Sequence, residues 1–168
     1  MKKSSNQLAL LGICTALSMV LSYLEFLIPP IFPSIPGIKM GLTNIVIIFL
    51  LYNLGFKSAF LVSIVRVFAV SLLFGNVMTL IYSLAGAILS LVVMSVMKKL
   101  NLFSCVGVSV CGGIVHNLAQ ILVAMIMLEN AVIGYYMITL AVTGTISGVV
   151  IGIISSKIIE KIHYNNIF

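Results

Sequence analysis

Long apolar runs, broken by short polar, glycine- or proline-containing segments, dominate the chain. They lack the two-residue alternation of a half-buried strand and the 3.6-residue alternation of a surface helix. Continuous apolar runs are expected when the surrounding medium is itself apolar, and a helix of about 20 such residues crosses a bilayer core. The pattern therefore predicts an all-α integral membrane protein with six transmembrane helices. Their expected ranges are residues 8–28, 41–54, 58–74, 77–96, 103–128 and 131–156.

The second predicted span is short for a membrane crossing. At about 1.5 Å per residue, residues 41–54 reach roughly 21 Å of a hydrocarbon core about 30 Å thick. A segment that holds all four prolines precedes it, and proline favours an extended, stiff connection there. We expect this span to continue into ordered loop or to tilt among its neighbours. The alternative is a five-span protein in which this segment is re-entrant.

Composition supports the same fold class. Of the 168 residues, 62% are hydrophobic and only 7% are charged, whereas an ordinary soluble domain has about 25% charged residues. So few charges could not cover the surface of a water-soluble domain of this size. The length fits one transmembrane domain, residues 1–168.

The net charge of +6 indicates an orientation in the membrane rather than a nucleic-acid partner. The lysines stand at the ends of apolar runs, as expected when cytoplasmic loops carry the positive charge. With the N-terminus inside, the outer loops carry Lys39 as their only lysine, together with Glu129. The inner lysines are Lys2, Lys3, Lys57, Lys98, Lys99, Lys157 and Lys161. The asymmetry predicts cytoplasmic termini in a multi-pass protein of the cell (plasma) membrane.

Arg66 lies near the centre of the third predicted span. A lone cation in hydrocarbon costs several kcal/mol on insertion scales, so it needs a partner or a water-filled cavity. The side chain could contact a ligand. It could instead be a structural tie to helix-end carbonyls or to Glu25.

Three hydrogen-bonding residues, His116, Asn117 and Gln120, fall on one sector of the fifth predicted span. Such side chains are not expected to face lipid. They could line a ligand pocket or bond to neighbouring helices. A lone histidine without a second His, Cys or Asp nearby predicts no metal site.

Polar residues at the ends of two other spans add candidates. Asn76 begins a stripe of polar and small residues along the fourth span, which could line a cavity or permit close packing. Lys39 and Asn44 flank the start of the second span, where the loop could cover an outward-facing pocket. A surface lysine beside a helix start is the simpler interpretation. The candidate substrate-binding residues are therefore Lys39, Asn44, Arg66, Asn76, His116, Asn117 and Gln120.

Small residues recur at four-residue spacing in two spans. Gly144, Gly148 and Gly152 form a double GxxxG in the last span, and Gly12 and Ala16 repeat the spacing in the first. Small residues allow close helix contacts in lipid, where no hydrophobic force drives association. The last span is expected to pack inside the bundle. The first could pack internally or dock another membrane protein.

The absence of certain residues argues against catalysis. All three acidic residues are glutamates, so the aspartate-rich clusters that usually hold Mg²⁺ against a diphosphate are missing. The sequence contains no GxxxxGK[ST] phosphate loop, and no set of nucleophile, base and orienting group stands out. We expect neither enzymatic activity nor a cofactor, and active transport would require a partner ATPase.

Several motifs together resemble one family. Residues 36–45 read Pro-Gly-Ile-Lys-Met-Gly-Leu-Thr-Asn-Ile after a proline-rich loop, and residues 63–67 read Ser-Ile-Val-Arg-Val. Phe-Gly-Asn follows at 74–76 and Tyr-Ser-Leu-Ala-Gly-Ala at 82–87. Over nearly the whole chain they resemble the family labelled Gx transporter or heptaprenyl diphosphate synthase component I. That family is similar to the substrate-binding S components of energy-coupling factor (ECF) transporters.

The resemblance implies an S-component-like bundle with cytoplasmic termini and a first-loop lid over an outward pocket. Gly12 and Ala16 would contact a transmembrane coupling subunit in place of the usual alanine pair, and two ABC-type ATPases would supply energy. The candidate substrate-binding residues would hold a small organic molecule, vitamin-, quinone- or isoprenoid-related. The alternatives are a non-catalytic membrane accessory subunit of polyprenyl (heptaprenyl) diphosphate or quinone biosynthesis, or a stand-alone secondary transporter.

Overall fold

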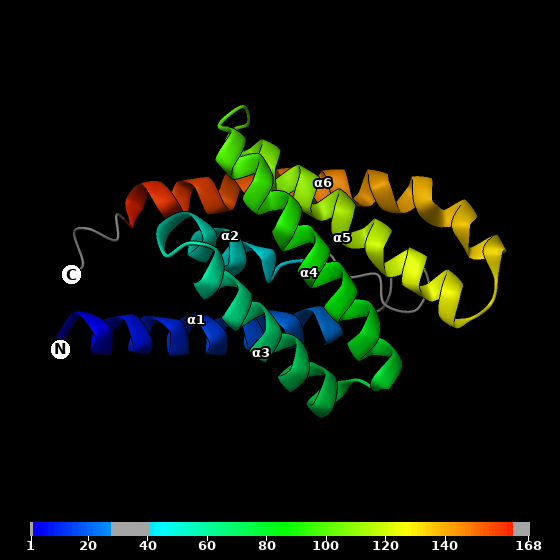
Figure 1. Cartoon of the computed structure of the whole chain (residues 1–168), viewed down its shortest axis with the longest axis horizontal. Coiled ribbons are helices and arrows are strands. Elements are labelled where there is room, and N and C mark those ends of the chain that lie inside the picture. The colour runs from blue at the N-terminus through cyan, green and yellow to red at the C-terminus, as the bar shows by residue number, and fades with distance from the viewer. Residues whose placement is uncertain (1, 28–40, 163–168) are drawn as a thin grey trace.

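A computed structural model describes residues 2–27 and 41–162, and these are helical apart from short turns. Six α-helices and one short 3-10 helix pack side by side in this part of the chain (Figure 1). Their bounds are α1 Lys2–Leu27, α2 Asn44–Asn53, α3 Phe56–Phe74, α4 Val77–Leu100, α5 Cys105–Met127, η1 Ala131–Tyr136 and α6 Met137–Lys161. The predicted all-α class is confirmed. The proline-rich loop and Lys39 lie outside the described residues.

The six predicted spans correspond to the six α-helices, but they differ in length. Within the described residues, five helices are long and apolar enough to cross a membrane: α1, α3, α4, α5 and α6, the last together with η1. The remaining helix, α2, has ten residues, which rise about 15 Å. That is roughly half of a hydrocarbon core, so α2 alone does not cross it.

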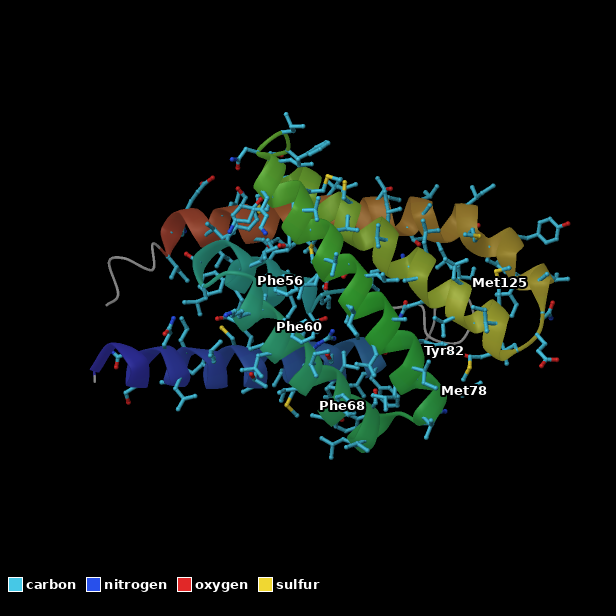
Figure 2. All side chains as sticks on the ribbon, in the orientation of Figure 1. Phe56, Phe60, Phe68, Met78, Tyr82 and Met125 are labelled. Atoms are coloured by element: carbon cyan, nitrogen blue, oxygen red, sulfur yellow. The ribbon has the colours of Figure 1, made fainter. Side chains whose placement is uncertain are left out.

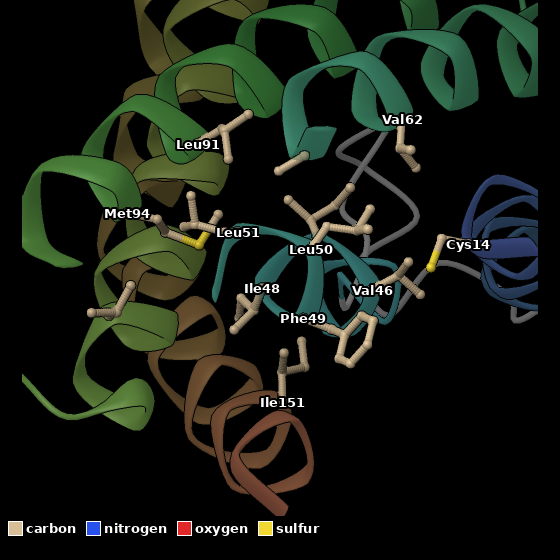
Figure 3. Packing of buried hydrophobic residues seen from close by; sticks show 13 residues of the cluster. Cys14, Val46, Ile48, Phe49, Leu50, Leu51, Val62, Leu91, Met94 and Ile151 are labelled. Carbon is tan, nitrogen blue, oxygen red and sulfur yellow. The ribbon is translucent and has the colours of Figure 1, made fainter. Parts of the chain in front are cut away.

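The short helix α2 forms the centre of the hydrophobic core. Ile48 and Leu50 have no exposed surface, and Figure 3 shows them among side chains from the surrounding helices. Met94 comes from α4, Val62 from α3 and Ile151 from α6. A helix that is apolar on every side is expected to be buried on every side. The composition of α2 therefore explains its central place.

Two features end α2 after ten residues. Gly55 has a φ of +85°, a conformation that glycine adopts without the steric cost of a Cβ, and it turns the chain into α3. Lys98 of α4 donates from Nζ to the Leu51 carbonyl oxygen at 2.8 Å and lies 4.8 Å from the Tyr52 ring centroid. A cation is favourable at a helix C-terminus, where carbonyls lack helical partners. Lys98 thus fixes the end of α2.

Replacing Lys98 with methionine is expected to destabilise the protein. The change keeps the apolar stem but removes the charge-assisted hydrogen bond, so the free energy of unfolding should fall by about 1–3 kcal/mol. Thermal unfolding in a mild detergent, followed by circular dichroism, measures the loss. The matched control is Lys99→Met, because Lys99 is exposed on the next position of the helix and should change stability by less than about 0.5 kcal/mol. Equal effects of the two substitutions would contradict this role of Lys98.

The α5–α6 pair packs backbone against backbone. A Cβ added to Gly144 would lie 2.8 Å from the Gly113 carbonyl oxygen of α5. A Cβ added to Gly148 would lie 2.7 Å from the Cα of Val110, and one added to Gly152 would lie 2.7 Å from the Cα of Val106. The glycine spacing of the last span therefore serves internal packing, as expected from the sequence.

The helix α1 lies at the periphery of the bundle. It packs mainly against α3, and most of its length is exposed. Near its C-terminal end, the Tyr23 ring lies 4.9 Å from that of Phe74 at the end of α3. The start of α1 and the end of α6 lie at the same end of the molecule (Figure 1).

The outer surface of the bundle is apolar. Phe56, Phe60 and Phe68 follow α3 (Figure 2), with 39%, 38% and 44% of their surfaces exposed. Leu72 of α3 and Ile138 of α6 are exposed to a still greater extent. Contiguous apolar surface of this kind is rare on soluble monomers and matches the acyl chains of a bilayer.

Candidate functional site

A buried arginine joins three segments of the chain. Arg66 projects from α3 and is only 7% exposed. Its Nη1 donates to the hydroxyl of Thr43, just before α2, at 2.9 Å, and to the hydroxyl of Ser22 on α1 at 3.2 Å. Both hydroxyl-bearing residues are buried. Arg66 therefore turns inward, as the cost of a cation in lipid requires.

Glu25 completes this group of residues. It lies on the same face of α1 as Ser22, three positions further on, and is 8% exposed. Its Oε1 accepts a hydrogen bond from the Leu42 backbone N–H at 2.7 Å, and its negative charge attracts Arg66. We call Ser22, Glu25, Thr43 and Arg66 the arginine node. The node places one positive and one negative side chain inside the apolar bundle.

Three members of the arginine node were not among the predicted site residues. Ser22 and Glu25 carry a sequence signal, because two polar residues three apart share one face of an otherwise apolar helix. Thr43 carries none, since its hydroxyl reaches Arg66 only through the turn that begins α2. Such a contact between distant segments requires the tertiary structure.

A second buried polar pair lies between α4 and α5. His116 and Gln120 of α5 face Gly86 of α4, with which they make very close contact. A Cβ at Gly86 would lie 2.9 Å from the His116 Cε1 and 3.0 Å from the Gln120 Cγ. The missing side chain at this glycine therefore provides the room for the imidazole and the amide.

Asn117 does not share that interface. Its Nδ2 donates to the Leu140 carbonyl oxygen of α6 at 3.0 Å. Successive helix residues are turned by about 100°, and α5 lies between α4 and α6, so His116 and Asn117 face different neighbours. All three predicted residues, including Gln120, are buried. They lie on one buried sector of α5 that contacts two neighbouring helices, and their binding of a substrate stays a prediction.

Two other predicted binding residues, Asn76 and Asn44, lie at helix starts. Asn76 is exposed and caps α4, since its Oδ1 accepts from the Thr79 N–H at 2.8 Å. Asn44 begins α2 and is buried, with its Nδ2 3.2 Å from where a Cβ on Gly41 would lie. Lys39 lies outside the described residues. Substrate binding by these three residues stays a prediction.

The small residues of α1 face away from the bundle. Gly12 and Ala16 are both exposed, and a Cβ added to Gly12 would meet no atom within 4 Å. The neighbouring side chains of Ile13 and Leu17 are also exposed. Nothing in the described part of the chain packs on this strip of α1, so the small residues do not serve packing within it. Their contact with a partner stays a prediction.

The described residues include no group of three or more His, Cys, Asp or Glu side chains that could hold a metal ion. The site is therefore defined by hydrogen bonding and charge. The arginine node can donate to an acceptor, and the His116–Gln120 pair offers further polar atoms in the same bundle.

A comparison with protein-family models gives one decisive match. The model described as heptaprenyl diphosphate synthase component I aligns with residues 14–158. The chain belongs to this family. The component I match includes the whole arginine node, the His116–Gln120 pair and Ala16, whereas Gly12 precedes it. No curated protein and no solved structure matches the chain.

Proposed function

We propose that this component I protein is the substrate-binding membrane subunit of an importer of the energy-coupling factor type. It would capture a small organic molecule from outside, and separate subunits would drive its release inward. The observation that carries the proposal is the arginine node, where charged and hydroxyl groups from α1, α3 and the start of α2 converge inside an apolar bundle.

Energetics favour a functional role for the node. Taking two charges out of water costs several kcal/mol per ion, and well-packed apolar residues often replace a buried ion pair with no loss of stability. An ionisable residue inside the membrane therefore indicates a functional site unless another role is shown. A ligand contact gives Arg66 a use that packing alone does not.

The proposed subunit has no catalytic role of its own and needs partners. The chain has no aspartate and no phosphate-binding loop, so the energy for import would come from ABC-type ATPases through a transmembrane coupling subunit. The exposed small-residue strip of α1 supports such docking, because small residues let helices approach closely in lipid. The lysine distribution supports an orientation with both termini cytoplasmic, and the proposed assembly would lie in the plasma membrane.

Replacing Gly12 or Ala16 with leucine is expected to release the coupling partner. The added side chain would hold a docking helix away, while the fold should persist because Gly12 has no neighbour within 4 Å. Co-purification from the native host measures partner retention. The control is Val142→Leu, on the exposed face of α6, which should leave the assembly intact. Full retention of the partner by both α1 variants would rule out this docking surface.

A second candidate function follows from the family description. Component I of a heptaprenyl diphosphate synthase suggests an accessory membrane subunit that anchors a soluble catalytic subunit or binds its lipid product. Purification from the native host in mild detergent, followed by mass spectrometry of proteins and small molecules, distinguishes this accessory role from the importer role. ATPases with a coupling subunit support the importer. A prenyl synthase as the sole stable partner would overturn it.

A further inference from the structure

Two exposed lysines at one end of the bundle have no acidic residue near them in the sequence. Lys57 lies in the first turn of α3 and Lys99 in the last turn of α4. The two helices are consecutive and joined by a short turn, so the start of α3 and the end of α4 lie at the same end of the bundle (Figure 1). No aspartate or glutamate occurs between Glu25 and Glu129. The counter-charge for these lysines therefore does not come from α3, α4 or the turns beside them.

The neighbouring Lys98 connects these two helix ends. Its Nζ donates to the Leu51 carbonyl oxygen of α2 at 2.8 Å, and Gly55 then turns the chain from α2 into α3. The end of α4 is therefore fixed beside the turn that leads to Lys57. Because the Lys98 ammonium already has a carbonyl partner, Lys57 and Lys99 are the cations that remain for a ligand at this place.

Apolar side chains flank both lysines. Phe56 and Phe60 of α3 stack with their ring centroids 5.8 Å apart, and both rings remain exposed (Figure 2). Lys57 precedes Phe60 by three residues, so the two side chains are neighbours on the helix surface. Leu102 follows Lys99 in the turn after α4 and is 77% exposed. A ligand that matches this surface has a negative charge next to a hydrocarbon chain, as an anionic phospholipid does.

The lysines at the end of α6 have a different environment. Lys157 and Lys161 are also exposed, but Glu160 follows Lys157 by three residues and directly precedes Lys161. Helix residues three apart are neighbours, so this carboxylate offsets part of the positive potential there. An anionic headgroup is therefore expected to bind at the α3–α4 end in preference to the end of α6.

We propose that Lys57 and Lys99 bind the headgroup of an anionic phospholipid, and that an acyl chain of this lipid lies against Phe56 and Phe60. Lysine stems lie along apolar surface while the ammonium groups reach the headgroup. The lysine distribution predicts that this end faces the cytoplasm, where the leaflet carries anionic lipids. The bound lipid bridges α3 and α4 where Lys98 holds the end of α2. An importer subunit and an accessory subunit would both use such a site.

Native mass spectrometry of the full-length protein, released from detergent micelles, tests the preference for an anionic headgroup. The probes are dioleoyl phosphatidylglycerol and dioleoyl phosphatidylcholine, which share their acyl chains and differ in headgroup charge. We expect phosphatidylglycerol to bind at least about tenfold more tightly. The double variant Lys57→Gln/Lys99→Gln should lose most of this preference. The matched control Lys157→Gln/Lys161→Gln removes the same charge and should keep it.

Cross-linking on the native protein locates the lipid without any variant. Phosphatidylglycerol and phosphatidylcholine with the same diazirine on an acyl chain are added separately to phosphatidylcholine vesicles that contain the protein. Exposed residues near the end of α6, Ile153 and Ile154, are the internal reference. We expect the ratio of phosphatidylglycerol to phosphatidylcholine cross-links to be at least about threefold higher at Phe56 and Phe60 than at this reference.

Three results would overturn the inference. The first is equal binding of the two lipids by the native protein, which is expected if this surface instead docks an acidic soluble protein. The second is an equal loss of preference in the two double variants, which would show that net charge alone decides. The third is the same cross-link ratio on α3 and α6, which would show that the anionic lipid has no preferred place.

Discussion

The Gly148→Ala variant is expected to lose about 1–3 kcal/mol of stability, and Gly148→Leu to prevent folding. A Cβ at this position would lie 2.7 Å from the Cα of Val110 and 3.1 Å from the Ser109 carbonyl oxygen. Both are backbone atoms of α5, so the whole helix has to move to make room. Overpacking of this kind is destabilising because partners can relax only by shifting backbone. Unfolding in mild detergent, followed by circular dichroism, measures the effect.

The control for this prediction is Gly12→Ala. Gly12 also lies within a helix but has no neighbour within 4 Å, so the added methyl group costs no contact. Alanine is a better helix former than glycine by about 0.5–1 kcal/mol, and this variant should be as stable as the native protein or slightly more so. The two glycine-to-alanine changes are thus expected to have opposite signs. A loss at Gly12 equal to that at Gly148 would show that α1 packs on something in the isolated protein.

Removing Arg66 alone is expected to cost about 3–5 kcal/mol, because the change to methionine removes a buried cation that the Glu25 charge attracts. The same substitution combined with Glu25→Gln should recover part of the loss, since the double variant removes both charges that attract each other. A double-mutant cycle of unfolding free energies measures the coupling between the two sites. Residues that act independently would give additive losses, and that result would refute the assignment of Glu25 as the counter-charge of Arg66.

Features set by one helix and its medium could be predicted from the sequence. The long apolar runs predicted the helices, and the GxxxG spacing of Gly144 and Gly148 predicted close helix packing. Both predictions depend on the residues of a single segment. The inward position of Arg66 also follows from the cost of a cation in lipid. These expectations needed no knowledge of which helices are neighbours.

Features set by neighbours could not be predicted. Asn117 and Gln120 are three residues apart, yet Asn117 bonds to α6 while Gln120 lies against Gly86 of α4, because α5 lies between two helices. Asn76 looked like part of a polar stripe, but its side chain caps α4. The contact between Thr43 and Arg66 depends on the turn that begins α2. Apart from the local cap at Asn76, these partners are distant in sequence, so spacing along one helix carries no information about them.

The central place of α2 has a consequence for biogenesis. The segment is synthesised second, but its core partners Met94, Val108 and Ile151 belong to helices that emerge later. With ten residues, α2 is too short to span a bilayer by itself. It is also too apolar to remain exposed to water. Until the C-terminal helix is synthesised, the apolar surface of α2 has to be covered by the insertion machinery or by the first and third helices. A ribosome that stalls before residue 137 therefore leaves a strongly hydrophobic segment without its final surroundings.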